Sequence, residues 1–125
     1  MRVLGFSKKW PKLSNPEFTT FRYPRKDRDW QVGELVQLVY HPRSKDREVL
    51  GTAEIVLKEK RNVNITSTFS DIPQVSYVEA VRDGFVNQVD MFSWFAKTYG
   101  GNANPIMNKL TLRKEGVENA IELSS

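Results

Sequence analysis

The sequence has no cysteine and only one histidine, His41, among its 125 residues. Without cysteine, disulfides and cysteine-ligated zinc are excluded. One imidazole cannot build a multi-histidine site by itself, so we expect neither a bound metal nor another cofactor.

Long apolar runs are also missing. No stretch approaches the roughly 18 apolar residues of a membrane-spanning helix, and Met1 to Trp10 lacks the apolar segment of a signal peptide. We therefore expect a soluble, cytoplasmic protein with no membrane partner. The 125 residues fit a single domain, 1–125, which is large enough to bury a core without metals or disulfides.

Positive charge is concentrated in the first thirty residues, although the formal net charge of the chain is only +4. This segment has eight basic residues against three acidic ones, a local excess of five. The basic residues are Arg2, Lys8, Lys9, Lys12, Arg22, Arg25, Lys26 and Arg28. Such a cluster, interleaved with aromatic side chains, is typical of nucleic-acid binding. The alternative is a solvated face above structural aromatics.

The segment 17–41 carries the pattern that is most informative about function. Phe18–Tyr23 is rich in aromatic and β-branched residues and predicts a short strand. The five charged residues 25–29 predict a solvated loop. Leu35–Tyr40 is so continuously apolar that we expect a strand buried on both faces. The arrangement places Thr20 and Arg22 at the rim of a β-core.

The remaining patterns predict an α+β fold. Strands are expected over Arg2–Phe6, over Glu48–Glu59 with a bulge at Gly51, and over Ile106–Leu112, which closes the sheet. Loops are expected over Ser7–Pro16, Pro42–Asp46 and Thr66–Gln74, with a weakly patterned tail from Lys114 to Ser125.

Two short helices are predicted in the second half of the chain. Ser76 and Glu79 have the spacing of a capping box, and Gly84 ends the first helix. The second helix begins at Asn87 or Gln88 and ends at the pair Gly100 and Gly101. Its expected inward residues are Val89, Phe92, Trp94 or Phe95, and Tyr99.

Four short motifs follow one another between Asn15 and Arg113. They are Trp30-x-x-Gly33-Glu34, Gly51-x-Ala53-x-Ile55 with Glu59, Glu79-Ala80-x-x-Asp83-Gly84-Phe85, and Asn108-Lys109-Leu110-Thr111-Leu112. In this order they resemble the ASCH domain of the PUA-like β-barrel superfamily. The resemblance implies a small β-barrel, with its core at about 15–113 and two or three short helices packed at one opening. It also implies a cleft where RNA or a nucleobase binds.

The family signature before the first long strand is similar to Gly-x-Lys-x-x-Glu or Thr-x-Arg. Placed on this sequence, its arginine falls on Arg22 and its threonine alternative on Thr20. The lysine position is occupied by Glu17 and the glycine position by Asn15. The chain therefore keeps one half of the signature and departs from the other.

The family includes a small bacterial acetylcytidine amidohydrolase, for which a lysine, a nucleophilic threonine and a glutamate are proposed. The resemblance places the threonine on Thr20 and the glutamate on Asp83, with Arg22 orienting the substrate. Because Glu17 stands in the lysine position, the cation that would help a hydroxyl to act as nucleophile is missing there. A lysine from the loop 7–16 could reach the cleft instead.

Three functions remain open. The first is RNA or nucleoside binding through a basic cleft, because arginine can clamp phosphates and stack on rings. Its candidate contact residues are Arg22, Arg25, Lys26, Arg28, Lys8, Lys9, Lys12, Tyr23 and Tyr40. The second is an amidohydrolase that acts on a modified nucleoside. The third is a protein-interaction module that uses an exposed strand edge.

Overall fold

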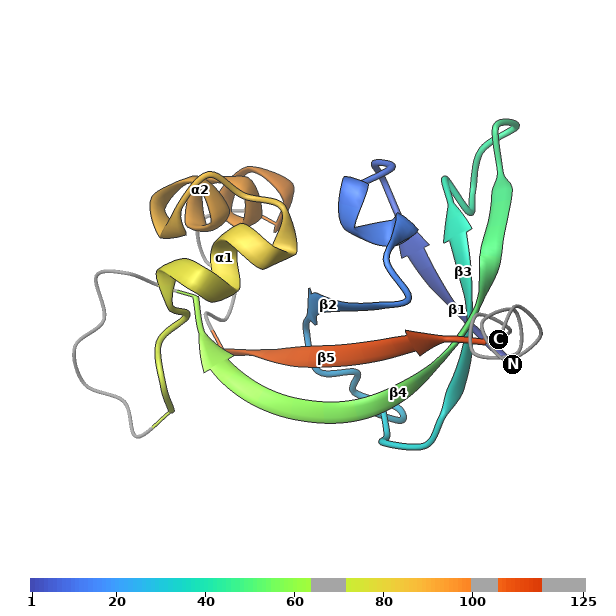
Figure 1. The fold of residues 1–125 in the computed structure, drawn as a ribbon, viewed down its shortest axis with the longest axis horizontal. Helices are drawn as coiled ribbons and strands as arrows, with labels where there is room; N and C mark the ends of the chain where they lie inside the picture. The colour runs from blue at the N-terminus through green and yellow to red at the C-terminus, as the bar shows by residue number, and fades with distance from the viewer. Residues whose placement is uncertain (64–71, 100–105, 116–125) are drawn as a thin grey trace, which may run out of the picture.

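The computed structural model describes residues 1–63, 72–99 and 106–115, which form one mixed five-stranded sheet and two α-helices (Figure 1). The strands are β1 (Arg2–Phe6), β2 (Glu17–Arg22), β3 (Leu35–Tyr40), β4 (Glu48–Asn62) and β5 (Ile106–Lys114). The helices are α1 (Tyr77–Asp83), α2 (Gln88–Tyr99) and the short 3-10 helix η1 (Pro11–Ser14). The predicted α+β class is confirmed.

The strands are arranged in the order β1-β3-β4-β5-β2. β1 pairs with β3 in parallel, and the other three pairings are antiparallel. Within the described residues no pairing joins β1 to β2, so the sheet is open and the expected closed barrel is not confirmed. The prediction that the last strand closes the sheet is wrong, because β5 lies between β4 and β2.

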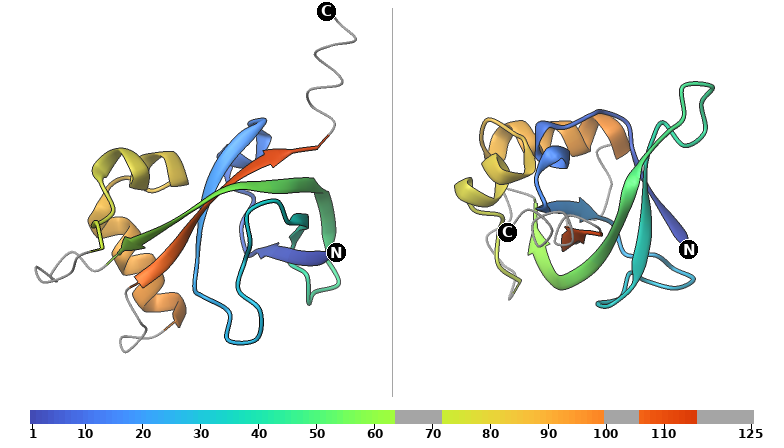
Figure 2. Two further views of the ribbon diagram at one scale, coloured as in Figure 1. Left: turned by 90° about the horizontal axis from the view of Figure 1, so that it is seen from below. Right: turned by 45° about the vertical axis from the view of Figure 1, so that its right-hand side comes forward.

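β4 is long enough to pair with two neighbours in turn. Its first part pairs with β3 as far as Glu54, and its second part pairs with β5 from Ala53 to Asn62. The register with β3 shifts next to Gly51, whose φ is 138°, so the bulge predicted there is confirmed. Bulges bend strands, and the curvature of β4 carries the sheet from β3 and β1 towards the two helices (Figures 1 and 2).

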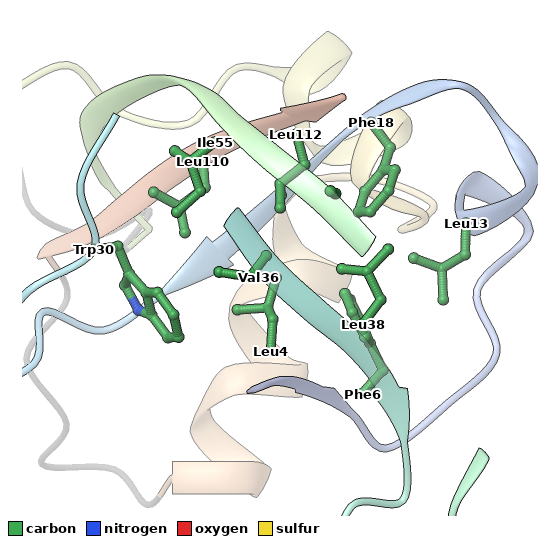
Figure 3. Close-up of a cluster of buried hydrophobic side chains, with 11 residues drawn as sticks. Leu4, Phe6, Leu13, Phe18, Trp30, Val36, Leu38, Ile55, Leu110 and Leu112 are labelled. Carbon is green, nitrogen blue, oxygen red and sulfur yellow. The ribbon is translucent and has the colours of Figure 1, made fainter. Parts of the chain in front are cut away.

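Buried side chains form two clusters on this frame. The first lies inside the curved sheet and receives side chains from all five strands (Figure 3). The second packs under the helices and includes Phe21, Phe85, Met91, Phe95 and Met107. Leu35 is 43 % exposed, so the prediction that β3 is buried on both faces is wrong at its first residue.

Local signals determine where α1 begins and ends. The Ser76 hydroxyl accepts from the Glu79 amide, and the Glu79 carboxylate accepts from the Ser76 amide, so the predicted capping box is confirmed. Gly84 ends the helix in the left-handed conformation, with φ 113°. On α2, Met91 is buried whereas Val89 is 56 % exposed. The inward position predicted for Val89 is therefore wrong, because the helix turns the face of Met91 and Phe95 to the core.

In the parts of the chain that the structure describes, no helix is long and apolar enough to cross a membrane. Several predictions lie outside these residues: the helix end at Gly100 and Gly101, the side chain of Tyr99, most of the loop Thr66–Gln74, and the tail beyond residue 115.

Candidate functional site

A cleft of about 790 Å3 lies beside the ends of β1 and β2, where the helices approach the sheet. η1, the loop after β2, the turn 41–44 and both α-helices also contribute to its lining. The predicted site residues Thr20, Arg22 and Asp83 all line it. Two segments that are distant in sequence, β2 and the end of α1, therefore meet at one place.

The floor of the cleft contains a buried ion pair between Lys12 of η1 and Asp83 at the end of α1. Lys12 Nζ lies 2.6 Å from Asp83 Oδ1, and each side chain is only 6 % exposed. Lys12 Nζ also donates to the backbone carbonyl of Thr19 at 2.7 Å. These contacts satisfy the ammonium with two oxygens and fix its position beside β2.

Burial dominates the protonation chemistry of this pair. It raises the pKa of Asp83 to about 6, although the nearby cations Lys12 and Arg22 oppose the shift. Burial also lowers the pKa of Lys12, and the attraction of Asp83 offsets only part of this effect. Carboxyl groups whose pKa lies near neutrality can exchange a proton with a ligand, which is a property of many functional sites.

Thr20 and Arg22 stand two residues apart on β2, so their side chains lie on the same face of the strand. Thr20 is 4 % exposed, and Arg22 Nε donates to its hydroxyl oxygen at 3.2 Å. The Arg22 guanidinium also lies 4.7 Å from the centre of the Phe6 ring. The arginine is thus held in place by the ring below it and by the hydroxyl beside it.

Aromatic rings form one wall of the cleft. Trp10 lies 5.2 Å from Phe85 and 5.6 Å from Trp94, measured between ring centres. Its six-membered ring packs against Gly84, where a Cβ atom would come within 2.7 Å of the indole. The glycine that ends α1 therefore also allows Trp10 to approach the helix. From the sequence, Trp10 is a stacking candidate beside the basic residues, whereas the aromatic residues of α2, including Trp94, are expected in the core and Phe85 has no site role.

The mouth of the cleft is formed by Arg25 and Tyr23 after β2 and by His41, Arg43 and Ser44 of the β3–β4 turn. Arg25 and Tyr23 are contact residues predicted from the sequence, whereas the turn is expected only as a polar loop. A basic and hydroxylic turn between two long strands is a weak signal. Only the fold shows that it faces the cleft.

The other candidate contact residues lie elsewhere. Lys9 pairs with Glu48 at 2.5 Å and lies 5.0 Å from the Tyr40 ring, Arg28 is 3.9 Å from Glu34, and the Lys26 side chain is exposed. The cleft lining includes none of Lys8, Lys9, Lys26, Arg28 or Tyr40. Lys8 contacts the cleft indirectly, because its ammonium lies 4.4 Å from the centre of the ring of Trp10, which is a lining residue. The basic cluster of the sequence is therefore divided between the cleft and other surfaces.

The cleft contains a lysine, Lys12, but it is not at the position that the resemblance indicated. Glu17, at the corresponding position, is half exposed and lies 3.6 Å from Arg113, away from this cleft. Lys12, five residues earlier, supplies the ammonium from η1. Pro11 at the start of η1 indicates only the short helical turn that carries Lys12, since proline favours the first turn of a helix.

Residues 1–63, 72–99 and 106–115 contain no group of three or more His, Cys, Asp or Glu side chains placed to hold a metal ion. Comparison of the chain with protein-family models, with curated proteins and with solved structures gives no match. The cleft is therefore interpreted from its geometry and chemistry.

Proposed function

We propose that the protein is an ASCH-like, PUA-like domain that binds a nucleobase, as part of a nucleoside or an RNA, in this cleft. The observation that carries the proposal is the joint lining of one cleft by an aromatic wall and by hydrogen-bonding groups, of which all but Arg22 are buried. The wall is Trp10, Phe85 and Trp94, and the polar set is Lys12, Thr20, Arg22 and Asp83. A volume of about 790 Å3 is within the range of small-molecule sites.

The aromatic wall of the cleft suits the flat face of a base, and the polar groups suit its hydrogen-bonding edge. Aromatic rings stack on the face of any base, with a contribution of about 1–3 kcal/mol for each stacked base. Arg22 offers a planar fork of donors for the polar edge of the base, and Asp83 offers an acceptor or, when protonated, a donor. An arginine that already contacts Phe6 and Thr20 loses less freedom on binding than an extended surface lysine does.

Equilibrium binding of the four common ribonucleosides and of a short single-stranded RNA tests this function. Trp10 and Trp94 lie in the lining, so their fluorescence reports an occupied cleft directly. We expect Arg22→Ala to weaken binding by at least about tenfold, as loss of a charged hydrogen-bond donor predicts. The matched variant Arg28→Ala, outside the lining, should bind as the parent does. Absence of binding to all of these ligands would overturn the proposal.

A second candidate, an amidohydrolase that acts on an acylated nucleoside such as acetylcytidine, is favoured by the position of Lys12. The resemblance calls for a lysine near a nucleophilic threonine and an acid, and Lys12, Thr20 and Asp83 line the same cleft. In such a reaction the threonine oxygen would attack the acyl carbon, the amide C–N bond would break, and water would release acetate. Asp83, with its pKa near 6, suits the proton transfer.

This candidate is tested by incubating the protein with acetylcytidine and measuring cytidine and acetate. We expect turnover that Thr20→Val abolishes and that Thr20→Ser partly retains, because serine keeps the hydroxyl. Nucleoside binding by Thr20→Val shows that the cleft is still formed. Binding without turnover in the parent would leave the binding function and remove the enzyme.

A further inference from the structure

The cleft has a cationic mouth in addition to its polar floor. Four Lys or Arg side chains line it, against the single carboxylate of Asp83. Lys12 is paired with that carboxylate at 2.6 Å, so the remaining lining arginines give the cleft a net positive charge. They are Arg22, Arg25 and Arg43. A neutral nucleoside carries no negative charge that could pair with these arginines.

Arg43 is placed at the mouth by a turn that is fixed to the end of β1. The amide of His41 donates to the carbonyl of Phe6 at 2.9 Å, and the amide of Ser44 donates to the carbonyl of His41 at 3.0 Å. His41 has a φ of 46°, which is uncommon for a residue with a side chain and bends the turn sharply. Pro42 lies on Gly5, where a Cβ atom would come within 2.8 Å of the proline ring.

Arg25 contributes to the lining from the loop after β2, and its backbone is also anchored. Its amide donates to Asp29 Oδ1 at 3.1 Å. Asp29 in turn accepts hydrogen bonds from Lys58 at 2.9 Å and from Asn108 at 3.0 Å, which tie the loop to β4 and β5. The guanidinium of Arg25 contacts Asp27 at 3.5 Å, with both side chains about half exposed or more. Such exposed pairs are weak, so a ligand can compete for this guanidinium.

We infer that Arg25 and Arg43 form a phosphate-binding subsite, so that the ligand is a nucleotide or a nucleotide unit of an RNA and not a neutral nucleoside. Guanidinium groups bind phosphate oxygens through paired hydrogen bonds. His41 and Ser44, in the same lining, add further donors. The inference rests on the proposed function, which places the base against Arg22 and the aromatic wall and leaves the phosphate at the mouth.

The test compares a nucleoside, its 5′-monophosphate and a short single-stranded RNA that contains it, by titration at constant salt. We expect the monophosphate to bind at least about tenfold more tightly than the nucleoside, as a charge-assisted contact predicts. Arg25→Ala and Arg43→Ala should each reduce this advantage, because each should weaken binding of the monophosphate much more than binding of the nucleoside. Raising the salt concentration should weaken binding of the monophosphate much more than binding of the nucleoside.

Two exposed residues outside the lining provide matched controls: Arg47→Ala on the turn of Arg43, and Lys26→Ala beside Arg25. Both should keep the full advantage of the monophosphate. Equal affinity for nucleoside and monophosphate would overturn the phosphate subsite and leave base binding intact, whereas binding of neither would overturn both. An RNA that binds more tightly than the monophosphate, with the same dependence on Arg25 and Arg43, identifies RNA as the source of the phosphate and supports the subsite.

Discussion

Lys12 and Asp83 are 71 residues apart in the sequence, yet Lys12 Nζ donates to Asp83 Oδ1 at 2.6 Å inside the protein. The contact joins η1 to the end of α1 and forms the floor of the cleft. A buried ion pair contributes little net stability relative to apolar residues, but removing one partner leaves an uncompensated charge. The pair therefore couples the shape of the cleft to the ionisation of one carboxyl group.

Lys12→Met should destabilise the protein by about 3 kcal/mol at pH 8, because Asp83 would be buried and ionised without its cation. The loss of Lys12 removes a contact that lowers the pKa of Asp83, so this pKa should rise further above its present value of about 6. A raised carboxyl pKa makes stability fall as pH rises from about 4 through the folded pKa, since the folded state holds the proton longer. Urea denaturation at pH 5 and pH 8 should therefore show a smaller loss at pH 5.

The double variant Lys12→Met, Asp83→Leu is the control for this experiment. It removes both charges and should regain most of the stability that Lys12→Met loses, with little dependence on pH between 5 and 8. A Lys12→Met protein that loses less than about 1 kcal/mol, equally at both pH values, would contradict the buried pair.

Gly84→Ala should cost more stability than Gly33→Ala. Both glycines have positive φ, 113° and 91°, where alanine is strained by about 1 kcal/mol. Nothing lies within 4 Å of a Cβ atom at residue 33, whereas at residue 84 it would come within 2.7 Å of Trp10. Thermal denaturation should separate the variants, and the tryptophan fluorescence of Gly84→Ala should shift because Trp10 is displaced. Equal losses in both variants would show that the indole moves aside freely.

The parts of the fold that depend on local chemistry could be predicted from the sequence. The capping box of Ser76 and Glu79 and the helix end at Gly84 involve neighbours a few residues apart, and these are confirmed. The phase of α2 could not be found in the same way. Val89 and Met91 are both apolar, and only the packing of the helix on Phe21 and Phe85 determines which of them is buried.

The candidate site shows the same limit. Thr20, Arg22 and Asp83 were found because they resemble a family signature, and they line one cleft. The importance of Lys12 could not be predicted, since its partner lies 71 residues away and depends on where α1 ends. Arg43 was missed because its turn is brought to the cleft by contacts between residues distant in sequence, the hydrogen bond from the His41 amide to the Phe6 carbonyl and the packing of Pro42 on Gly5.

Glu79→Ala should destabilise the protein more than Ser76→Ala, although both remove the capping box. The serine variant should lose about 1 kcal/mol, the usual contribution of an N-cap. Glu79 Oε2 also accepts from Arg61 Nε at 2.9 Å and from Lys109 Nζ at 2.7 Å, which tie α1 to β4 and β5. We therefore expect a loss of about 2–4 kcal/mol for Glu79→Ala in urea denaturation.

Glu48→Ala is a suitable control for the charge removed at Glu79. Glu48 pairs with Lys9, but both side chains are more than half exposed, so the loss should be below about 0.5 kcal/mol. A Glu79→Ala protein no less stable than Ser76→Ala would show that the contacts with Arg61 and Lys109 add nothing to the cap.

Asp29 should make the protein sensitive to acid. Burial alone would raise the pKa of Asp29, but hydrogen bonds from Lys58, Asn108 and the amides of Arg25 and Trp30 lower it to about 2 from its ordinary value of 3.8. A lowered carboxyl pKa stabilises the folded state above about pH 4, and this contribution is lost as the pH falls towards 2. Asp29→Asn should therefore lose about 1–2 kcal/mol at pH 7, allowing for the partial hydration of the carboxylate, and much less at pH 2.5.

Asp46→Asn, with an exposed side chain, should match the parent at both pH values in urea denaturation. If Asp29→Asn lost the same amount at both pH values, the effect would come from packing and not from ionisation. Because Asp29 also holds the backbone of Arg25, the variant should bind a nucleoside monophosphate more weakly than the parent even at neutral pH, where most of the protein remains folded.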